Sequence, residues 1–451
     1  MPKTRRKGKL GRNEETTSDE DSLENGSVYS LQSDARSLVG DDPDEDNGLL
    51  KLNEQLEERF IEAVDGASQK SAAGRAKCLD SICEILLKRY MPDFVAERQM
   101  TVTDLIERSI KKGRGIEQAA AARVVPLLCI QLGGGENLCR DLNPILTTTA
   151  LDPAVPYDAR GKCCTALGLL NFLAGGDLGD ILSLMKSLEL IFSSSYLKVR
   201  KIMFDNLLAT YLVTHQQFFF PKGDGSVNTI SVDAGAMHAA ALSSWGLLLT
   251  LIPAGDVVNF MADGLRTLPS IKSLAGLLQS SHLEVRLIAG ECIALLLEIG
   301  RGHQEDFLDS YLCELIDATK QLATDSHKYR AKRDRKTQRA TFRDILHYLE
   351  EDIPPDMQVR FGTEVLILDS WTLHRQYNAI CGTLGTGLNL HLAENDFIRD
   401  IFELGPRLES FGANINKQTK LERHLMNAAA FKARTISRNK NRDKRSAVVS
   451  C

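Results

Sequence analysis

The sequence is poor in aromatic residues and has no long hydrophobic run. Aromatic residues make up 6% of its 451 residues, and no apolar stretch approaches the roughly 20 residues that a membrane-spanning helix needs. The first twelve residues, MPKTRRKGKLGR, lack the apolar core of a secretory signal. We therefore expect a protein without a membrane partner, located in the cytoplasm and with the nucleus as a second compartment.

Paired cysteines are also lacking. The ten cysteines are scattered and form no CxxC pair, and several lie inside apolar helical runs, where a small thiol is easily buried. Scattered cysteines inside apolar helices are typical of proteins whose thiols stay reduced in the cytosol or nucleus. It argues against both a disulfide framework and a zinc site.

Motifs of known catalytic chemistry are missing as well. The sequence contains no P-loop, no HExxH, no GxSxG and no dinucleotide fingerprint between a strand and a helix. The Gly-rich stretch 382–387 lacks the Lys followed by Ser or Thr with which a phosphate-binding loop ends, so it predicts a turn. His374 and His391 lie near acids, but neither has a third partner at catalytic or ligand spacing. We expect no enzyme activity, no cofactor, no metal and no small-molecule substrate.

Charge is strongly segregated, although the formal net charge is only −5. Residues 1–12 carry six basic residues and no acid, whereas residues 13–46 carry twelve acids against a single Arg36. Low apolar content predicts that residues 1–47 form a disordered tail, basic and then acidic. The basic start suits a nuclear address or a nucleic-acid-binding arm. The acidic part suits a solubilising tail or the substrate of an acid-directed kinase.

A recurring phrase predicts helical repeats over residues 48–324. The phrase is a polar residue, a small or compact residue three positions later, and large apolar residues at positions +7 and +10. Its complete copies start at Arg75, Gln118, Arg160, His238 and Arg286, and a partial copy starts at Arg200 and has Thr210 at position +10. A period of about 40–47 residues with paired amphipathic helices is typical of HEAT and armadillo repeats. We therefore predict an all-α, HEAT/armadillo-like solenoid with a loop insertion at 218–232, followed by a smaller, mostly helical C-terminal domain.

After residue 324 the pattern indicates a basic helix over 325–351. With 100° between successive residues, six cations fall on a stripe about 100° wide; they are Lys328, Lys332, Arg335, Lys336, Arg339 and Arg343. Tyr329 and Phe342 are expected to flank this stripe. Like charges at i, i+4 spacing repel each other by a few tenths of a kcal/mol per pair. Such a face is favoured mainly when phosphates bind it; a solvated surface helix is the alternative.

The remaining chain predicts a C-terminal domain over 352–416 and a basic helix and tail over 417–451. The domain begins with a break at 352–355 and an extended apolar run at 365–368, followed by helices over 373–392 and 394–404. Residues 417–445 hold ten Lys or Arg against two acids. The first half of 417–445 keeps a helical apolar rhythm, and the second half carries Lys432, Arg434, Arg438, Lys440, Arg442, Lys444 and Arg445. A helix that is basic on most of its circumference cannot dock on its own core. It is either a solvated tail or a probe for a polyanionic environment.

Several of these stretches resemble the interferon-related developmental regulator family. The resemblance is carried by ERQMTVTDLIERSIKKG (97–113), LCIQLG (128–133), VRLIAGECIALLLEI (285–299), LATDSHKYRAKRDRKTQRATFRDIL (322–346), FGTEVLILDSW (361–371), FELGP (402–406) and HLMNAAAFKARTISRNKNRDKR (424–445). It implies helical repeats, a conserved C-terminal domain and no enzyme activity. It also implies binding to ribosomes that are not translating, or co-regulation of transcription with deacetylase complexes.

By motif match, the resemblance assigns two sets of cations. Lys432, Arg434, Arg438, Arg442, Lys444 and Arg445 would enter the mRNA channel, and Lys332, Arg333, Arg335, Lys336 and Arg339 would form a second basic surface. This chain departs from the family mainly at 193–235, so contacts made there by relatives are not carried over.

Two functional hypotheses remain open at this point. The first is a non-catalytic regulator that binds ribosomes through rRNA and blocks tRNA and mRNA sites. An RNA-walled channel offers phosphates on every side of a helix, and recognition by shape and phosphate needs no base-reading motif. The alternative is a nuclear scaffold whose acidic repeats recruit protein partners, transcriptional co-repressor complexes among them.

Overall fold

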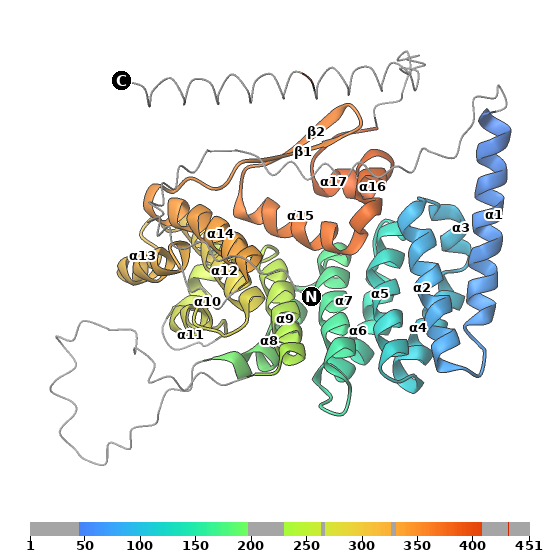
Figure 1. Ribbon diagram of the computed structural model, residues 1–451, viewed down its shortest axis with the longest axis horizontal. Coiled ribbons are helices and arrows are strands. Elements are labelled where there is room, and N and C mark those ends of the chain that lie inside the picture. Colours follow the sequence, from blue (N-terminus) through green and yellow to red (C-terminus); the bar gives the residue numbers. More distant parts are fainter. Residues whose placement is uncertain (1–44, 197–229, 263–266, 326–330, 408–431, 433–451) are drawn as a thin grey trace, which may run out of the picture. The chain divides into compact units, whose positions relative to one another are not determined.

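Helices make up almost all of the described chain (Figure 1). The structure, a computed structural model, describes residues 45–196, 230–262, 267–325, 331–407 and 432. Its elements up to Ala323 are α1 (Glu45–Gly66), α2 (Ala72–Lys88), α3 (Pro92–Glu97), α4 (Gln99–Lys112), α5 (Ile116–Leu132), α6 (Glu136–Leu151), α7 (Tyr157–Ala174), α8 (Leu178–Phe192), η1 (Ser193–Ser195), α9 (Val232–Leu249), α10 (Ala254–Met261), α11 (Ile271–Leu277), α12 (Leu283–Arg301) and α13 (Asp309–Ala323). Next come α14 (Lys332–Glu351), β1 (Met357–Phe361), β2 (Glu364–Leu368), α15 (Trp371–Leu384), η3 (Gly385–Gly387), α16 (Leu388–Glu394) and α17 (Asp396–Ile401).

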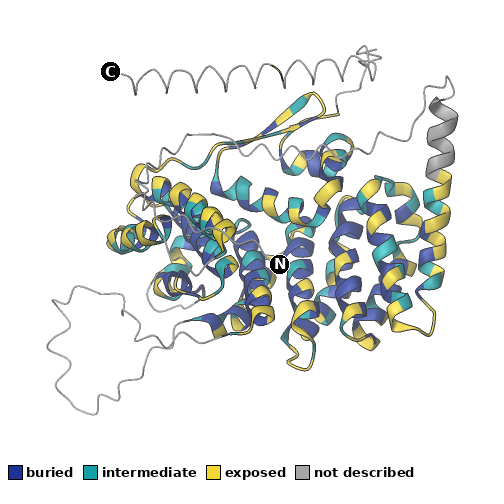
Figure 2. Cartoon of the chain, in the orientation of Figure 1, coloured by how far each residue is buried: buried dark blue, intermediate teal, exposed yellow. Residues whose placement is uncertain are grey.

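The helices stack as pairs in two rows, which confirms the predicted all-α helical-repeat fold. In the first row α2, α5, α7, α9, α12 and α14 each contact the next member. In the second row α1, α4, α6 and α8 lie beside α2, α5, α7 and α9 respectively, while α10 and α11 lie beside α12 and α13 beside α14. Buried residues lie mainly where the helices face one another (Figure 2). The two rows therefore share one core that runs along the array.

The recurring phrase lies in the first row of helices. Its described copies fall in α2, α5, α7, α9 and α12, and their +7 and +10 residues are all buried. The small +3 residues are also buried, except for Cys78, which is half-buried. Small side chains allow neighbouring helices to approach, and the larger residues then fill the seam between them. The copy at Arg200 lies outside the described residues, as does most of the predicted loop at 218–232.

The polar residue that starts each phrase joins its helix to a neighbouring segment. Arg75 forms an ion pair with Glu117 of α5 at 2.6 Å, and Arg160 donates from Nε to the Ala150 carbonyl at 2.8 Å. The His238 ring lies 2.6 Å from the Ser195 hydroxyl. These contacts explain why a polar residue recurs at a position that faces the interior.

Residues 352–405, called the strap below, begin with a β-hairpin. β1 and β2 pair antiparallel with Phe361 opposite Glu364, and Gly362 in the turn has φ of 56°, a value that glycine adopts without strain. This confirms the extended run expected at 365–368. The helix expected over 373–392 is wrong as a continuous element, because Gly385 ends α15 with φ of 48° and a short 3₁₀ turn precedes α16. The helix expected over 394–404 is shorter, and spans Asp396–Ile401.

The strap crosses the first row of helices. α15 contacts α12, α9 and α5, and η3 contacts α2 (Figure 1). At Gly387 the approach is so close that a Cβ atom would lie 2.2 Å from the Leu87 carbonyl oxygen. The chain up to Gly405 thus forms one compact unit, and a second unit starts at Pro406. The domain boundaries expected from the sequence remain predictions.

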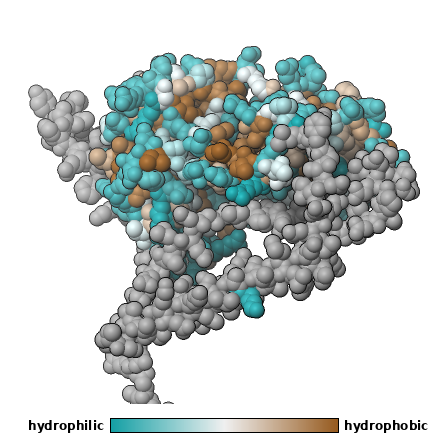
Figure 3. All heavy atoms as spheres, turned by 90° about the horizontal axis from the view of Figure 1, so that it is seen from above, coloured by the Kyte–Doolittle hydropathy of each residue, from teal (hydrophilic) through white to brown (hydrophobic). Residues whose placement is uncertain are grey.

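The surface and the thiols of the described residues are unremarkable for a helical-repeat protein. Hydrophobic patches lie within a mainly hydrophilic face (Figure 3). The nine cysteines in the described ranges are unpaired, and burial raises the pKa of Cys83, Cys129 and Cys292 to about 12. Within the same ranges, no helix is both long and apolar enough to cross a membrane.

Candidate nucleic-acid interface

α14 presents two chemically different faces. The buried face consists of Gln338, Phe342, Ile345, Tyr348 and Leu349 and packs against α12 and α13. At Gly290 of α12, a Cβ atom would lie 2.8 Å from both Phe342 and Ile345, so glycine permits this close contact. Phe342 is 0% exposed. The expectation that Phe342 flanks the cations on the surface is therefore wrong, because its ring fills the seam between α12 and α14.

The predicted cations lie on the other face of α14. Lys332, Arg333, Lys336 and Arg343 are exposed, and Arg335 and Arg339 are half-buried. Lys328 lies outside the described residues, and α14 begins only at Lys332. The structure thus brings six of the predicted cations together on one helix.

The C-terminal set of predicted cations is described at one position only. Lys432 is helical and exposed. Arg434, Arg438, Lys440, Arg442, Lys444 and Arg445 lie outside the described residues. Their assignment as RNA contacts remains a prediction.

The cations of α14 have no carboxylate partner within the described chain. No ion pair within 4.0 Å joins any of the six to Asp or Glu there, whereas Arg75, Arg123 and Arg301 of the repeats all form such pairs. The Nε atom of Arg335 is buried and has no hydrogen-bond partner among the described residues. The basic face is therefore left unmatched by its own fold.

The charges of α14 also oppose its helix dipole. Lys332, Arg333 and Arg335 lie in or next to the first turn with only Asp334 as an acid, and the last turn holds Glu350 and Glu351. A helix N-terminus carries a partial positive charge, so cations there are unfavourable by about 0.3–1 kcal/mol each at low ionic strength. The N-cap residue, Ala331, supplies no side-chain hydrogen bond to the first amides. The first turn of α14 is thus an electropositive surface that favours an anion.

A buried polar network fixes the orientation of α14. Arg286 of α12 donates from Nε and Nη2 to the side-chain oxygen of Gln338 at 3.1 and 2.8 Å. Gln338 in turn donates to the Leu322 carbonyl at 3.2 Å and to Asp325 at 3.1 Å. Sequence reasoning missed Gln338, whose only signal was a polar residue on the apolar side of a basic helix.

A buried arginine holds the C-terminal end of the strap together. Arg399 is 1% exposed and donates to both oxygens of Glu364 at 3.0 and 2.7 Å. It also donates to the carbonyls of Leu392, Leu404 and Gly405. Arg399 therefore holds the last residues of the strap, which end at Gly405 together with the first compact unit.

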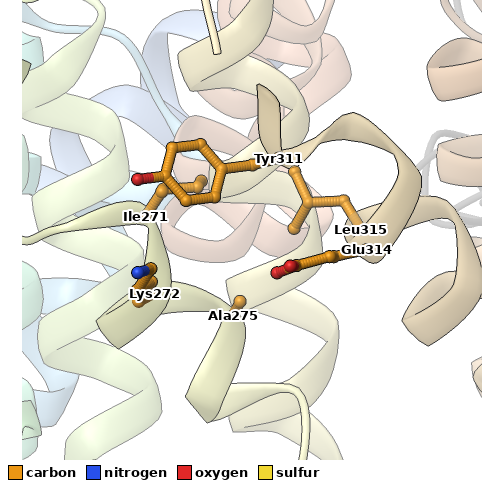
Figure 4. A pocket seen from close by; sticks show the side chains of 6 residues that line it. All are labelled: Ile271, Lys272, Ala275, Tyr311, Glu314 and Leu315. Atoms are coloured by element: carbon orange, nitrogen blue, oxygen red, sulfur yellow. The ribbon is translucent and has the colours of Figure 1, made fainter. Parts of the chain in front are cut away.

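The described interior contains a buried serine–histidine pair, Ser195 and His238. No cluster of His, Cys, Asp and Glu there could hold a metal ion. Burial lowers the pKa of His238 to about 4, with further contributions from His282 and Arg160, and no carboxylate of the described ranges is hydrogen-bonded to its ring. A depression between α11 and α13 has room for about one water molecule (Figure 4). Beside it, the Nζ atom of Lys272 lies 5.7 Å from the centroid of the Tyr311 ring.

Comparison with known proteins gives consistent matches along the chain. Residues 25–350 match the family model "Interferon-related developmental regulator (IFRD)", and residues 395–446 match "Interferon-related protein conserved region". The chain is 39% identical to mouse interferon-related developmental regulator 2, over 88% of this chain and 84% of that protein. It is 38% identical to pig interferon-related developmental regulator 1, over 97% of this chain and 92% of the pig protein. It is 37% identical to the human protein of that name, over 97% of this chain and 91% of the human protein. The chain therefore belongs to the interferon-related developmental regulator family, whose name describes regulators and not enzymes.

Proposed function

We propose that this protein is a non-catalytic regulator that binds translationally inactive ribosomes through rRNA. In this proposal α14 and the basic segment 432–445 contact RNA phosphates, and the C-terminal segment blocks the sites of mRNA and tRNA. Cytoplasmic location follows from the partner.

The observation that supports the proposal is the unmatched basic face of α14. Six cations without an acidic partner among the described residues lie on one side of a helix held by buried contacts, and those of the first turn oppose its dipole. Both features cost stability in the free protein, and both are relieved when phosphates bind. The absence of a base-reading motif fits a partner recognised by its backbone and shape, as folded RNA is.

Charge neutralisation on this scale predicts a strong dependence on salt. If six phosphates are contacted, the affinity should fall with a log–log slope of roughly −4 to −5 against salt concentration. Specific apolar recognition of a protein partner would give a much flatter dependence, because exposed charges contribute little to it.

Sedimentation with purified ribosomes tests the proposal. The full chain should co-sediment with non-translating 80S ribosomes at low salt and not with polysomes. The variant Lys332→Gln/Arg333→Gln/Lys336→Gln/Arg343→Gln should lose about 10-fold or more in affinity, since each lost phosphate contact removes about one unit of salt slope. Deletion of residues 430–451 should abolish binding.

A control outside α14 is Lys77→Gln/Lys162→Gln, which removes two exposed lysines from α2 and α7 and is compared with the equally charged variant Lys332→Gln/Lys336→Gln. This control should bind ribosomes like the unmodified chain. Equal binding by the control and the α14 variant would exclude α14 as the interface. A chain found only in the nucleus, with no crosslinked RNA, would favour the scaffold hypothesis instead.

A further inference from the structure

The cations of α14 that have no carboxylate partner in the described ranges attract any polyanion. The chain itself contains a polyanionic segment. Residues 13–46 hold twelve acids against one Arg36, and they end in the first residues of α1. The basic residues at 1–12 number six. Complete pairing with these six and with Arg36 still leaves 12 − 7 = 5 acids unmatched. The N-terminal segment therefore has acidic charge to spare for another basic surface.

We propose that the acidic segment 13–46 binds the exposed cations of α14 and competes with RNA for them. The identity of the competitor rests on the proposed function, but the contact between the segment and α14 does not. The segment thereby acts as an intramolecular inhibitor that raises the selectivity of α14 for the densest polyanions.

The chain is long enough for this contact. α14 lies five steps along the first row from α2, through α5, α7, α9 and α12. At 8–10 Å between neighbouring helix axes, these steps cover about 40–50 Å. Residues 13–44, which precede α1, span at most about 105–115 Å when extended. The acidic segment can thus reach α14 from the far end of the array without full extension.

Cations elsewhere on the repeats are weaker candidates for the segment. Arg75, Arg123 and Lys88 already form ion pairs with Glu117, Asp80 and Glu84. Lys332, Arg333 and Lys336 have no such partner in the described ranges and gather on one helix turn. An acidic segment gains most where cations are dense and no neighbouring carboxylate must be displaced.

The contact should be weak and sensitive to salt. Each exposed ion pair contributes little by itself, but tethering gives the segment an effective concentration near the millimolar range. RNA has a higher charge density and displaces the segment. We expect the tail to lower ribosome affinity by about 3- to 10-fold at low salt and to have no effect at high salt.

Carbodiimide crosslinking tests the contact without any nucleic acid. This reagent joins a carboxylate directly to a lysine amine in contact with it. In the free full-length chain, acids of 13–46 should couple to Lys332 and Lys336 in preference to the exposed Lys77 and Lys162. High salt or added ribosomes should remove these products. Coupling that is even over all exposed lysines, or confined to Lys3, Lys7 and Lys9, would overturn the proposal.

A variant cycle tests the competition. The neutralised tail is Glu14→Gln/Glu15→Gln/Asp19→Asn/Glu20→Gln/Asp21→Asn/Glu24→Gln, and the matched control is Ser18→Ala/Ser22→Ala/Ser27→Ala. Neutralisation should raise affinity for purified ribosomes by about 3- to 10-fold at low salt, and the control should change nothing. The gain should vanish when the four α14 cations are also replaced by glutamine.

The outcomes separate the two proposals. A gain that persists in the α14 variant places the action of the tail elsewhere and refutes the inference. If no version of the chain binds ribosomes, the proposed function fails, and the crosslinks alone still decide whether the acidic segment contacts α14.

Discussion

Two groups of cationic side chains in this molecule have opposite surroundings. Arg286, Arg375 and Arg399 are buried, and each donates to more than one acceptor, at least one of them far away in the sequence. The cations of α14 are mostly exposed and have no carboxylate partner in the described ranges. The fold thus supplies hydrogen-bond acceptors for the buried arginines that stabilise it. The charges it leaves unmatched on α14 are available to a partner.

Removal of a buried arginine should give the largest loss of stability. Arg399→Met leaves Glu364 and three carbonyl groups without their donor. We expect the free energy of unfolding to fall by about 3–5 kcal/mol, measured by denaturant titration. Arg360→Met on the exposed face of β1 is the control and should stay within about 0.5 kcal/mol. A loss below about 1 kcal/mol for Arg399→Met would break the distinction between the two groups.

The link between the two groups is Gln338, which accepts from Arg286 on the buried side of α14. Gln338→Leu leaves the Arg286 guanidinium, 2% exposed, without this acceptor. The unfolding free energy should drop by about 2–3 kcal/mol. Thr337→Leu, one residue earlier and exposed, should be nearly neutral. Equal effects would mean that α14 is not oriented by the network.

A pH titration sharpens the contrast between buried and exposed groups. Burial lowers the pKa of His391 to about 4, and the ring nitrogens contact the Leu86 carbonyl and Asn395. The unfolded chain has the ordinary pKa near 6.5 and takes up the proton first, so this contribution is present above pH 6.5 and is lost as pH falls toward 4. Between pH 7 and 5 the loss should be roughly 2 kcal/mol. His391→Gln should flatten the stability–pH curve by that amount; an unchanged curve would contradict the assignment.

Neutralising the exposed cations of α14 should change the free energy of unfolding least, and should raise it rather than lower it. Lys332→Gln and Arg333→Gln remove positive charge from a helix N-terminus. Each should raise the unfolding free energy by about 0.3–1 kcal/mol at low ionic strength, with the gain fading as salt is added. The same variants weaken ribosome binding in our proposal. A loss of stability would show that these charges serve the fold.

Much of the architecture could be predicted because it repeats. The small residue at +3 and the apolar residues at +7 and +10 recur in helix after helix, so Ala121, Ala241 and Ala289 carry a periodic signal of helix contact. The basic face of α14 could likewise be predicted from the sequence, because its cations recur at helical spacing. Phe342 was assigned to the wrong surroundings because its position on the helix alone does not show how far α12 covers that side.

The strap could not be derived in the same way. His391 reaches the Leu86 carbonyl, 305 positions away, and Glu298 accepts hydrogen bonds from the Trp371 and Thr372 amides. Each of these contacts depends on one polar residue and one distant backbone group, so neither partner changes the local pattern of the sequence. Gly387 gave a turn signal, but its contact with Leu87 became visible only in the structure.

The contact between the strap and α2 has a consequence for synthesis. An array of repeats can build up from its first helices as they are made, but the contact of the Leu86 carbonyl with His391 has to wait for a residue 305 positions later. At roughly 5–20 residues per second, this interval lasts about 15–60 seconds. During that time the end of α2 that the strap will cover faces solvent. A segment that is synthesised late therefore covers the end of one of the first helices of the array.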